Sequence, residues 1–247
     1  MSNIVDFDKE ILEFKSLFNE LEKAIKKRCE SFGVKEDFYK NSINKLKENN
    51  DPIIRKFYYS FIEVGEIRNF VIHNNTKKYS SPICPSPDYK NIIKDLTKEL
   101  KEPKKIINSK MCIKIDKIYT RSLNDNLEET IKEMIKNMYT HIPIIKEGKV
   151  IGVFSENTLL DIINKNGGII TDKNTKIGDY SNEIKITNHS LEVFPFISKD
   201  TTIYEVENIF ENYFKDNKRT GCVFVTNSGK ENEKILGMLT AWDVLGE

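Results

Sequence analysis

Lys234-Ile-Leu-Gly-Met-Leu-Thr-Ala-Trp-Asp-Val-Leu245 has a second copy earlier in the chain, Lys149-Val-Ile-Gly-Val-Phe-Ser-Glu-Asn-Thr-Leu-Leu160. In both copies a lysine precedes two aliphatic residues, a glycine, two apolar residues and a hydroxyl residue. This order predicts a buried strand that ends at the hydroxyl residue, where a helix begins. Such a corner points backbone N–H groups and the positive end of a helix outward, which favours bound anions.

The same elements precede each copy. Before the first copy, the Asn124-Asp-Asn126 stretch is expected to cap a helix, and a strand at 140–145 and a turn at Glu147-Gly148 follow. Before the second copy, Asp200-Thr201-Thr202 is expected to cap a helix, and a strand at 222–225 and a turn around Ser228-Gly229 follow. The order of helix, strand, turn, strand and helix therefore occurs twice, which indicates an internal repeat of an α/β unit.

This arrangement resembles a tandem pair of CBS domains, the Bateman module, over about residues 111–247, with repeat one at about 111–170 and repeat two at about 175–247. The resemblance implies a regulatory module. Such pairs commonly bind adenosine-containing ligands (AMP, ADP, ATP or S-adenosylmethionine) in clefts between the repeats and control an attached domain. Some members bind no nucleotide and serve as dimer scaffolds.

The resemblance also implies a set of ligand-binding residues. The nucleotide motif of the family is Gly, two apolar residues, Ser or Thr, two variable residues and Asp, and the second copy has it with Thr240 and Asp243. These two would bind the ribose hydroxyls, with Asp243 accepting two hydrogen bonds. His141, just before the middle strand of the first repeat, would meet the phosphates, and Thr201 would meet the purine.

The first copy departs from the motif, because Thr158 stands where Asp is expected after Ser155. A site there loses the charged acceptor and is expected to be weaker or empty. Simpler explanations also apply to the second copy. Thr240 and Asp243 have the spacing of a helix-capping pair, and His141 fits an ordinary half-buried histidine.

Composition sets the remaining limits on the class of protein. The 247 residues carry a net charge of +1, so no bulk field indicates nucleic acid or membrane binding. The four cysteines are scattered without a CxxC pair, so we expect neither a metal site nor a disulfide framework. The N-terminus is polar and no apolar run reaches membrane length, so we expect a cytoplasmic protein that needs no cofactor.

Residues 1–103 are predicted to form an all-α bundle. Apolar residues three and four apart predict a long helix from Phe7 to about Phe32, and a shorter helix follows near Tyr39. Asn50-Asp51-Pro52 begins a third helix that runs to about His73, and Ser86-Pro87-Asp88 begins a fourth that Pro103 stops. Residues 104–110 lack a helical period and are expected to be a linker to the next domain.

One stretch in this bundle has side chains suited to catalysis, Glu66-Ile-Arg68-Asn69-Phe-Val-Ile-His73. An arginine binds phosphate with a fork of donors, and a histidine moves a proton near neutral pH. Together they suit the orientation of an RNA phosphate for attack by the neighbouring 2′-hydroxyl. The stretch resembles the motif of HEPN domains, in which Arg and a polar residue are followed after four to six residues by His. That resemblance implies a dimeric, metal-independent endoribonuclease with Arg68 and His73 as the catalytic pair and Asn69 as a polar support.

This stretch also has a structural explanation. Residues five apart on an ideal helix are separated by about 140°, so Arg68 and His73 do not share a face without help, and both suit a helix C-terminus. Many HEPN-like bundles only bind or dimerise. The sequence therefore predicts a multi-domain regulatory homodimer, an all-α HEPN-like bundle followed by an α/β tandem CBS-domain pair that senses an adenosine ligand. The alternatives are a HEPN endoribonuclease or toxin gated by the CBS pair, and a non-catalytic scaffold that binds no nucleotide.

Overall fold

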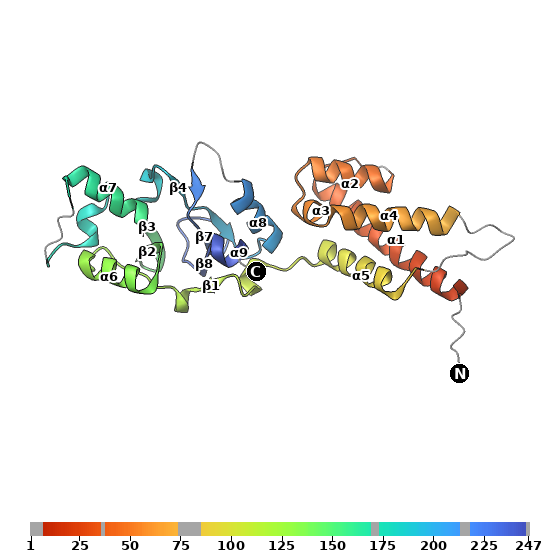
Figure 1. Ribbon diagram of the computed structural model, residues 1–247, viewed down its shortest axis with the longest axis horizontal. Coiled ribbons are helices and arrows are strands. Elements are labelled where there is room, and N and C mark those ends of the chain that lie inside the picture. The colour runs from red at the N-terminus through yellow and green to blue at the C-terminus, as the bar shows by residue number, and fades with distance from the viewer. Residues whose placement is uncertain (1–6, 36–37, 74–84, 169–172, 213–217, 246–247) are drawn as a thin grey trace. The chain divides into compact units, whose positions relative to one another are not determined.

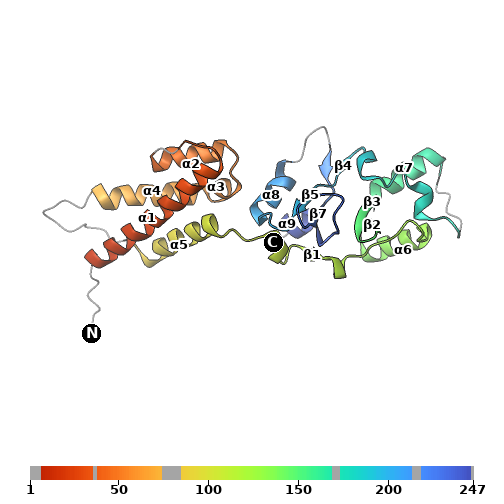
Figure 2. The ribbon, with the colours of Figure 1, turned by 180° about the vertical axis from the view of Figure 1, so that it is seen from behind.

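The computed structural model describes residues 7–35, 38–73, 85–168, 173–212 and 218–245. The chain divides into two compact units, Met1–Lys104 and Lys105–Glu247. The ribbon views show that the first unit is built from helices and that the second mixes helices and strands (Figures 1 and 2).

The first unit contains five helices within its described residues. They are α1 (Phe7–Ser31), α2 (Tyr39–Glu48), α3 (Pro52–Lys56), α4 (Tyr58–His73) and α5 (Pro87–Lys101). The stretch expected to be one helix over 52–73 is two helices, because Phe57 leaves the helical conformation with φ −107° and ψ 20°. The apolar spacing continues across this break, so the sequence did not indicate it.

A buried ion pair ties α1 to the start of α3. Oδ1 of Asp51 accepts hydrogen bonds from the backbone N–H groups of Ile53 and Ile54, at 2.9 and 3.1 Å, and so caps α3. Oδ2 of the same carboxylate lies 2.6 Å from Nε of Arg28, near the end of α1. The Asp51 side chain is fully buried, so the partner cation and the two N–H groups together offset the cost of removing its charge from water.

The described residues of the second unit form three small sheets. The strands are β1 (Ile113–Lys114), β2 (His141–Lys146), β3 (Lys149–Ser155), β4 (Glu192–Val193), β5 (Phe196–Ser198), β6 (Arg219–Thr220), β7 (Cys222–Thr226) and β8 (Gly237–Thr240). In the first repeat β2 and β3 form an antiparallel hairpin, and in the second the sheet order is β1-β8-β7-β5. β4 and β6 form a separate parallel pair.

Helices and short 3-10 turns connect these strands. The helices are α6 (Leu127–Asn137), α7 (Glu156–Asn166), α8 (Ile203–Asn212) and α9 (Ala241–Leu245). The 3-10 turns are η1 (Ile106–Asn108), η2 (Ile115–Lys117), η3 (Ile177–Tyr180) and η4 (Ile186–Asn188). Each copy of the repeated stretch is thus a strand (β3 or β8) that leads directly into a helix (α7 or α9).

The glycine of each repeated stretch leaves room for a crossing segment of chain. A Cβ atom on Gly152 would lie 2.6 Å from the carbonyl oxygen of Ile184, and one on Gly237 would lie 2.8 Å from that of Ile113. Those segments hydrogen-bond to the strands they cross, because the N–H of Val153 donates to Ile184 at 2.8 Å and β1 pairs with β8. The repeated glycine is therefore required for close approach of two backbones.

A shared apolar cluster joins the two repeats into one body. Its buried members come from β3 of the first repeat and from the strands and loops of the second: Val150, Val153, Phe194, Cys222, Phe224, Ile235 and Met238. Each repeat also has its own core on the helix side of its sheet. The face between the repeats is therefore fixed by packing, and a cleft along its edge has defined walls.

Two boundaries differ from the sequence-based assignment. Ile106, within the expected linker, is fully buried in the second-repeat core, and its N–H donates to the carbonyl of Thr201 at 2.8 Å. Ile177 and Ile184, assigned to the second repeat, pack in the first-repeat core. The chain therefore crosses between the repeats more than once, which a linear division into two repeats does not capture.

Candidate ligand site between the repeats

A cleft of about 220 Å³ lies where the two repeats meet. The second repeat contributes the end of β8 and the start of α9, and the first repeat contributes the segments before and after α6. The lining residues are Ile113, Lys117, Ile118, Tyr119, Met138, Tyr139, Thr140, His141, Met238, Thr240, Trp242 and Asp243.

Thr240 and Asp243 form the polar corner of this cleft. Oδ2 of Asp243 accepts from both the backbone N–H and the hydroxyl of Thr240, each at 2.7 Å. The pair therefore caps α9, as one interpretation of the sequence expected. Within the described chain, no hydrogen bond is made by the other carboxylate oxygen, Oδ1, so the same residue retains an acceptor for a ligand.

Two tyrosines form an aromatic wall of the cleft. The rings of Tyr119 and Tyr139 stack at 5.4 Å between centroids and 23° between planes, and the Arg121 guanidinium lies 4.8 Å from the Tyr119 centroid. Burial raises the pKa of Tyr119 against the opposing effect of Arg121, so its phenol is a neutral donor. Its hydroxyl oxygen is buried and has no hydrogen-bond partner in the described structure. This wall suits a planar ring that carries a polar edge.

His141 lines the cleft, and both of its ring nitrogens have partners. Nδ1 lies 2.8 Å from the Thr140 hydroxyl, and Nε2 lies 3.1 Å from Oε1 of Glu192. The Glu192 side chain is only 1% exposed, and its carboxylate also accepts from the Ser155 hydroxyl at 3.0 Å and from Nη2 of Arg219 at 3.1 Å. The imidazole is therefore oriented by a buried carboxylate of the other repeat.

The charge of Glu192 is maintained despite its burial. Burial raises the pKa of Glu192, but the hydrogen bond and charge of His141, with hydrogen bonds from Asn157 and Ser155, outweigh it and lower the pKa to about 2. A carboxylate thus stands beside the start of α7, where the first-repeat motif lacks its aspartate. The sequence did not single out Glu192, because it lies outside both copies of the repeated stretch.

A second hollow of about 200 Å³ adjoins the first. It shares Thr140, His141, Thr240 and Trp242 with the cleft, and Arg219 lines its far side with a side chain that is 59% exposed. The two hollows together extend from the tyrosine wall to Arg219, and Glu156 and Glu192 also line that end. These surfaces suit a ligand with a ring at one end and, at the other, a group that Arg219 can bind.

The structure brings together three of the five residues expected at the ligand site. Thr240, Asp243 and His141 line the same cleft. Thr201 and Ser155 are not among its lining residues. Thr201 contacts Ile106 through its carbonyl, and Ser155 is fully buried as the cap of α7. Tyr119, Tyr139 and Trp242 line it instead, and the sequence motif gave no signal for the two tyrosines.

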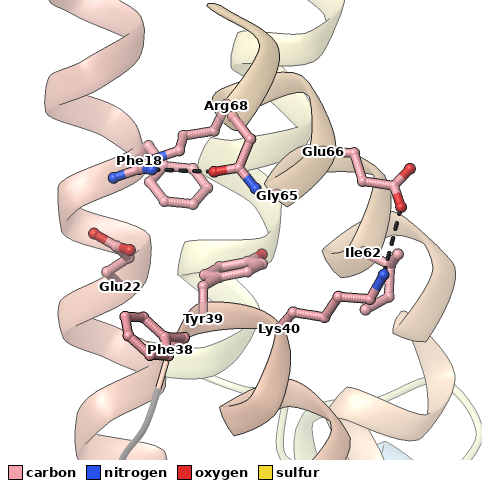
Figure 3. A pocket seen from close by; sticks show the side chains of 10 residues that line it. Phe18, Glu22, Phe38, Tyr39, Lys40, Ile62, Gly65, Glu66 and Arg68 are labelled. Atoms are coloured by element: carbon pink, nitrogen blue, oxygen red, sulfur yellow. Dashed lines mark hydrogen bonds and ion pairs between the residues drawn. The ribbon is translucent and has the colours of Figure 1, made fainter. Parts of the chain in front are cut away.

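The helical unit has a pocket of its own, of about 370 Å³, which Arg68 and Asn69 line. Nη1 of Arg68 donates to Oδ1 of Asn69 at 3.1 Å, and the guanidinium lies 5.4 Å from the centroid of Phe18 (Figure 3). His73 is the last residue of α4, and its side chain lies outside the described part of the structure. The geometry of the Arg68 and His73 pair is therefore not given by the structure.

No helix of the described residues is both long enough and apolar enough to cross a bilayer. Across the same residues, no group of three or more His, Cys, Asp or Glu side chains is placed to hold a metal ion.

Several solved structures are similar to this chain. CBSX2 in complex with AMP is 13% identical with a TM-score of 0.38, covering 58% of this chain and 94% of that chain. The CBS domain pair of protein MJ0100, in complex with 5′-methylthioadenosine and S-adenosyl-L-methionine, is 17% identical with a TM-score of 0.40, covering 58% and 94%. A CBS domain protein from Streptococcus pneumoniae TIGR4 is 12% identical with a TM-score of 0.40, covering 55% and 78%.

The family assignment rests on sequence rather than on these structural likenesses. A comparison with curated proteins gave no match. The CBS domain model matches residues 122–165 and 190–247, which include both copies of the repeated stretch, the hairpin of the first repeat and the second-repeat strands around the cleft. The second unit of this chain is therefore a CBS domain pair.

Proposed function

We propose that the CBS pair binds an adenosine-containing ligand, namely AMP, ADP, ATP or S-adenosylmethionine, in the cleft between its repeats, and that binding regulates the helical unit. One observation carries this proposal. Thr240 and Asp243 of the second repeat share a cleft with the tyrosine wall and His141 of the first repeat. A ligand in this cleft contacts both repeats. Its binding therefore stabilises the arrangement of the two repeats for which it has the higher affinity.

Each part of such a ligand has a matching surface. The ribose hydroxyls donate to Oδ1 of Asp243, which capping leaves without a partner in the described chain. The adenine ring packs against Tyr119 and Tyr139, where the unpartnered Tyr119 hydroxyl meets its polar edge. The phosphates, or the charged tail of S-adenosylmethionine, extend toward His141 and Arg219.

Isothermal titration calorimetry with the four ligands tests the proposal on the full chain. We expect saturable binding of at least one ligand and a loss of at least about tenfold in affinity in Asp243→Ala, since a charged acceptor is removed. Asp200→Ala is the matched control, because Asp200 is an exposed aspartate of the same unit that pairs with Lys105 and does not line the cleft. Absence of binding by all four ligands, or equal binding by Asp243→Ala, would refute the site.

We also propose that the protein acts as a homodimer whose geometry depends on this ligand. The observation in favour is that α6 and α7 expose large apolar side chains, Ile135 and Leu160. Light scattering coupled to gel filtration, with and without ligand, measures the mass. A monomer under both conditions contradicts the proposal.

A second candidate function is metal-independent RNA cleavage by the helical unit. Arg68 and Asn69 are hydrogen-bonded to each other at the edge of a pocket, and the buried Nε of Arg68 has no partner in the described chain. In this proposal Arg68 orients a phosphate, Asn69 supports it and His73 moves the proton. Cleavage of RNA in EDTA by the wild type but not by His73→Ala, with and without ATP or AMP, is expected. No cleavage under any condition refutes it.

A further inference from the structure

The pocket of the helical unit has features that neither regulation nor phosphate chemistry explains. It lies between α1, α2 and α4, and its volume of about 370 Å³ falls in the range of small-molecule sites. Its lining residues are Phe18, Glu22, Phe38, Tyr39, Lys40, Ile62, Gly65, Glu66, Arg68 and Asn69 (Figure 3).

Aromatic rings form the floor and the mouth of this pocket. The Tyr39 ring packs 5.0 Å from the Phe18 ring between centroids, and its hydroxyl donates to the carbonyl of Phe61 at 2.8 Å. A Cβ atom on Gly65 would lie 2.6 Å from the Tyr39 ring, so the glycine lets that ring lie flat against α4. Phe38, at the mouth, is 83% exposed. A planar ring that enters therefore meets aromatic surfaces.

Two charged groups of the pocket remain available for a ligand. The buried Nε of Arg68 has no hydrogen-bond partner in the described chain, and within the same residues Glu22 has neither a hydrogen bond nor an ion pair. Figure 3 shows Glu22 on α1 and Arg68 on α4 at the same side of the pocket, with Tyr39 and Phe38 below them. Lys40 and Glu66, at the other side, pair with each other at 3.7 Å.

A carboxylate and a guanidinium beside an aromatic floor match one nucleobase best. Guanine offers two adjacent N–H donors, N1 and N2, which a carboxylate accepts, and two adjacent acceptors, O6 and N7, which arginine donors fit. Adenine presents an N6 amino donor where guanine has O6, so it offers the guanidinium only N7, and it has no N1–H donor for the carboxylate. A phosphate held by Arg68 alone would leave the Glu22 carboxylate without a donor, whereas a guanine base supplies one. We propose that this pocket binds a guanine base, with Glu22 accepting from its N–H edge and Arg68 donating to its acceptors.

The base has two chemical sources, a free guanine nucleoside or nucleotide and an unpaired guanine in single-stranded RNA. Single-stranded bases are commonly bound by stacking on aromatic side chains while their edges are hydrogen-bonded. The proposal does not depend on ligand binding to the CBS pair, nor on RNA cleavage.

Guanosine titration of the full chain by calorimetry tests the proposal. We expect saturable guanosine binding in the wild type and in Asp243→Ala, which separates this pocket from the cleft of the CBS pair. Glu22→Gln is expected to lower guanosine affinity at least about tenfold, since a charged acceptor of two hydrogen bonds is lost. Glu20→Gln is the matched control, because Glu20 lies on the same helix, pairs with Lys23 and Lys101, and does not line the pocket.

Base analogues and oligonucleotides complete the test. Inosine, which lacks the N2 amino group, is expected to bind more weakly than guanosine, and adenosine is expected not to bind the Asp243→Ala protein. Oligouridylate with one central guanine is compared with GMP, and the tighter of the two identifies the source. Circular dichroism confirms that each variant is folded. No saturable guanosine binding, equal affinity in Glu22→Gln, or equal binding of adenosine by Asp243→Ala overturns the proposal.

Discussion

Nε2 of His141 lies 3.1 Å from Oε1 of Glu192, and the two residues belong to different strands, β2 of the first repeat and β4 beyond it. The same carboxylate accepts from Ser155 at the end of β3 and from Arg219 in β6. Because the Glu192 side chain is almost fully buried, its charge depends on these partners for stabilisation in place of water. This one carboxylate therefore fixes the orientation of His141 at the ligand cleft and joins the strands around it.

The Glu192 network predicts a pH dependence of stability. The pKa of Glu192, about 2 in the folded chain, lies below the value of about 4.3 for an unperturbed glutamate. The stabilisation of the fold by the ionised Glu192 carboxylate is therefore fully present above about pH 4.3 and is lost as pH falls toward 2. At neutral pH we expect Glu192→Gln to have a lower free energy of unfolding than the wild type. This gap between the two free energies should narrow below about pH 4.3.

Urea unfolding followed by Trp242 fluorescence, at several pH values, measures this gap, because the only tryptophan of the chain lies in the CBS pair. A gap that stays constant down to pH 2 contradicts the proposed role of the Glu192 charge.

Gly221 is predicted to be sensitive to a single added methyl group. A Cβ atom there would lie 2.6 Å from Cε1 of Phe194 and 2.8 Å from Nε2 of His141. Gly221→Ala must push the imidazole away from Glu192, and overpacking of this kind costs about 1–3 kcal/mol. We expect a lower melting temperature of the CBS pair and weaker ligand binding. Gly168→Ala, at a glycine with φ +149° and nothing within 4 Å of the added atom, adds backbone strain without a packing clash and is expected to leave ligand binding unchanged.

Trp242 is predicted to report ligand binding. Its side chain is 83% exposed but lines both hollows, so a bound ligand removes water from the indole. We expect a blue shift and a change in intensity of the intrinsic emission on titration with the ligand that calorimetry identifies. Trp242→Phe should abolish the signal while calorimetric binding persists. Unchanged emission at saturating ligand would place the ligand elsewhere.

Asp51 is predicted to be the most sensitive single position of the helical unit. Asp51→Ala removes the cap of α3 and leaves Arg28 without its buried partner, so we expect a loss of about 3 kcal/mol. Asp88→Ala, at an exposed first-turn position of α5, should change stability by no more than about 0.5 kcal/mol. Chemical unfolding followed by far-ultraviolet circular dichroism distinguishes the two variants.

Local sequence patterns predicted the helices of the CBS pair and the strands β2, β3, β7 and β8 because these elements have signals of their own. Asn126 caps α6 through a hydrogen bond from the N–H of Glu129 at 3.0 Å, and Thr202 caps α8 through Glu205 at 3.3 Å. The turn between β2 and β3 has positive φ at Glu147 and Gly148, as its sequence indicates. Capping and turn residues contact residues only a few positions away, so the local sequence is sufficient to predict these structures.

Features that depend on distant parts of the chain were not predictable in this way. Tyr119 lines the cleft and Glu192 lines the adjoining hollow; both lie outside the repeated stretches, and only the folded chain brings them into the same site as Thr240. The pairing of β1 with the sheet of the second repeat is a further example, because its two residues carry almost no pattern of their own. The resemblance to CBS pairs implied that Thr201 would meet the purine, whereas its carbonyl accepts a hydrogen bond from Ile106 in η1.

The pairing of β1 with β8 also sets the order in which the chain can fold. β1 opens the CBS pair and β8 stands near its end, so the hydrogen bonds between Ile113 and Met238 close a loop that contains nearly both repeats. Loop closure over such a distance is slow and must precede the gain from packing. During synthesis, β1 has no partner until β8 has left the ribosome. The sheet of the second repeat is therefore completed last, whereas the core of the first repeat contains no residue of β1 or β8 and does not wait for this step.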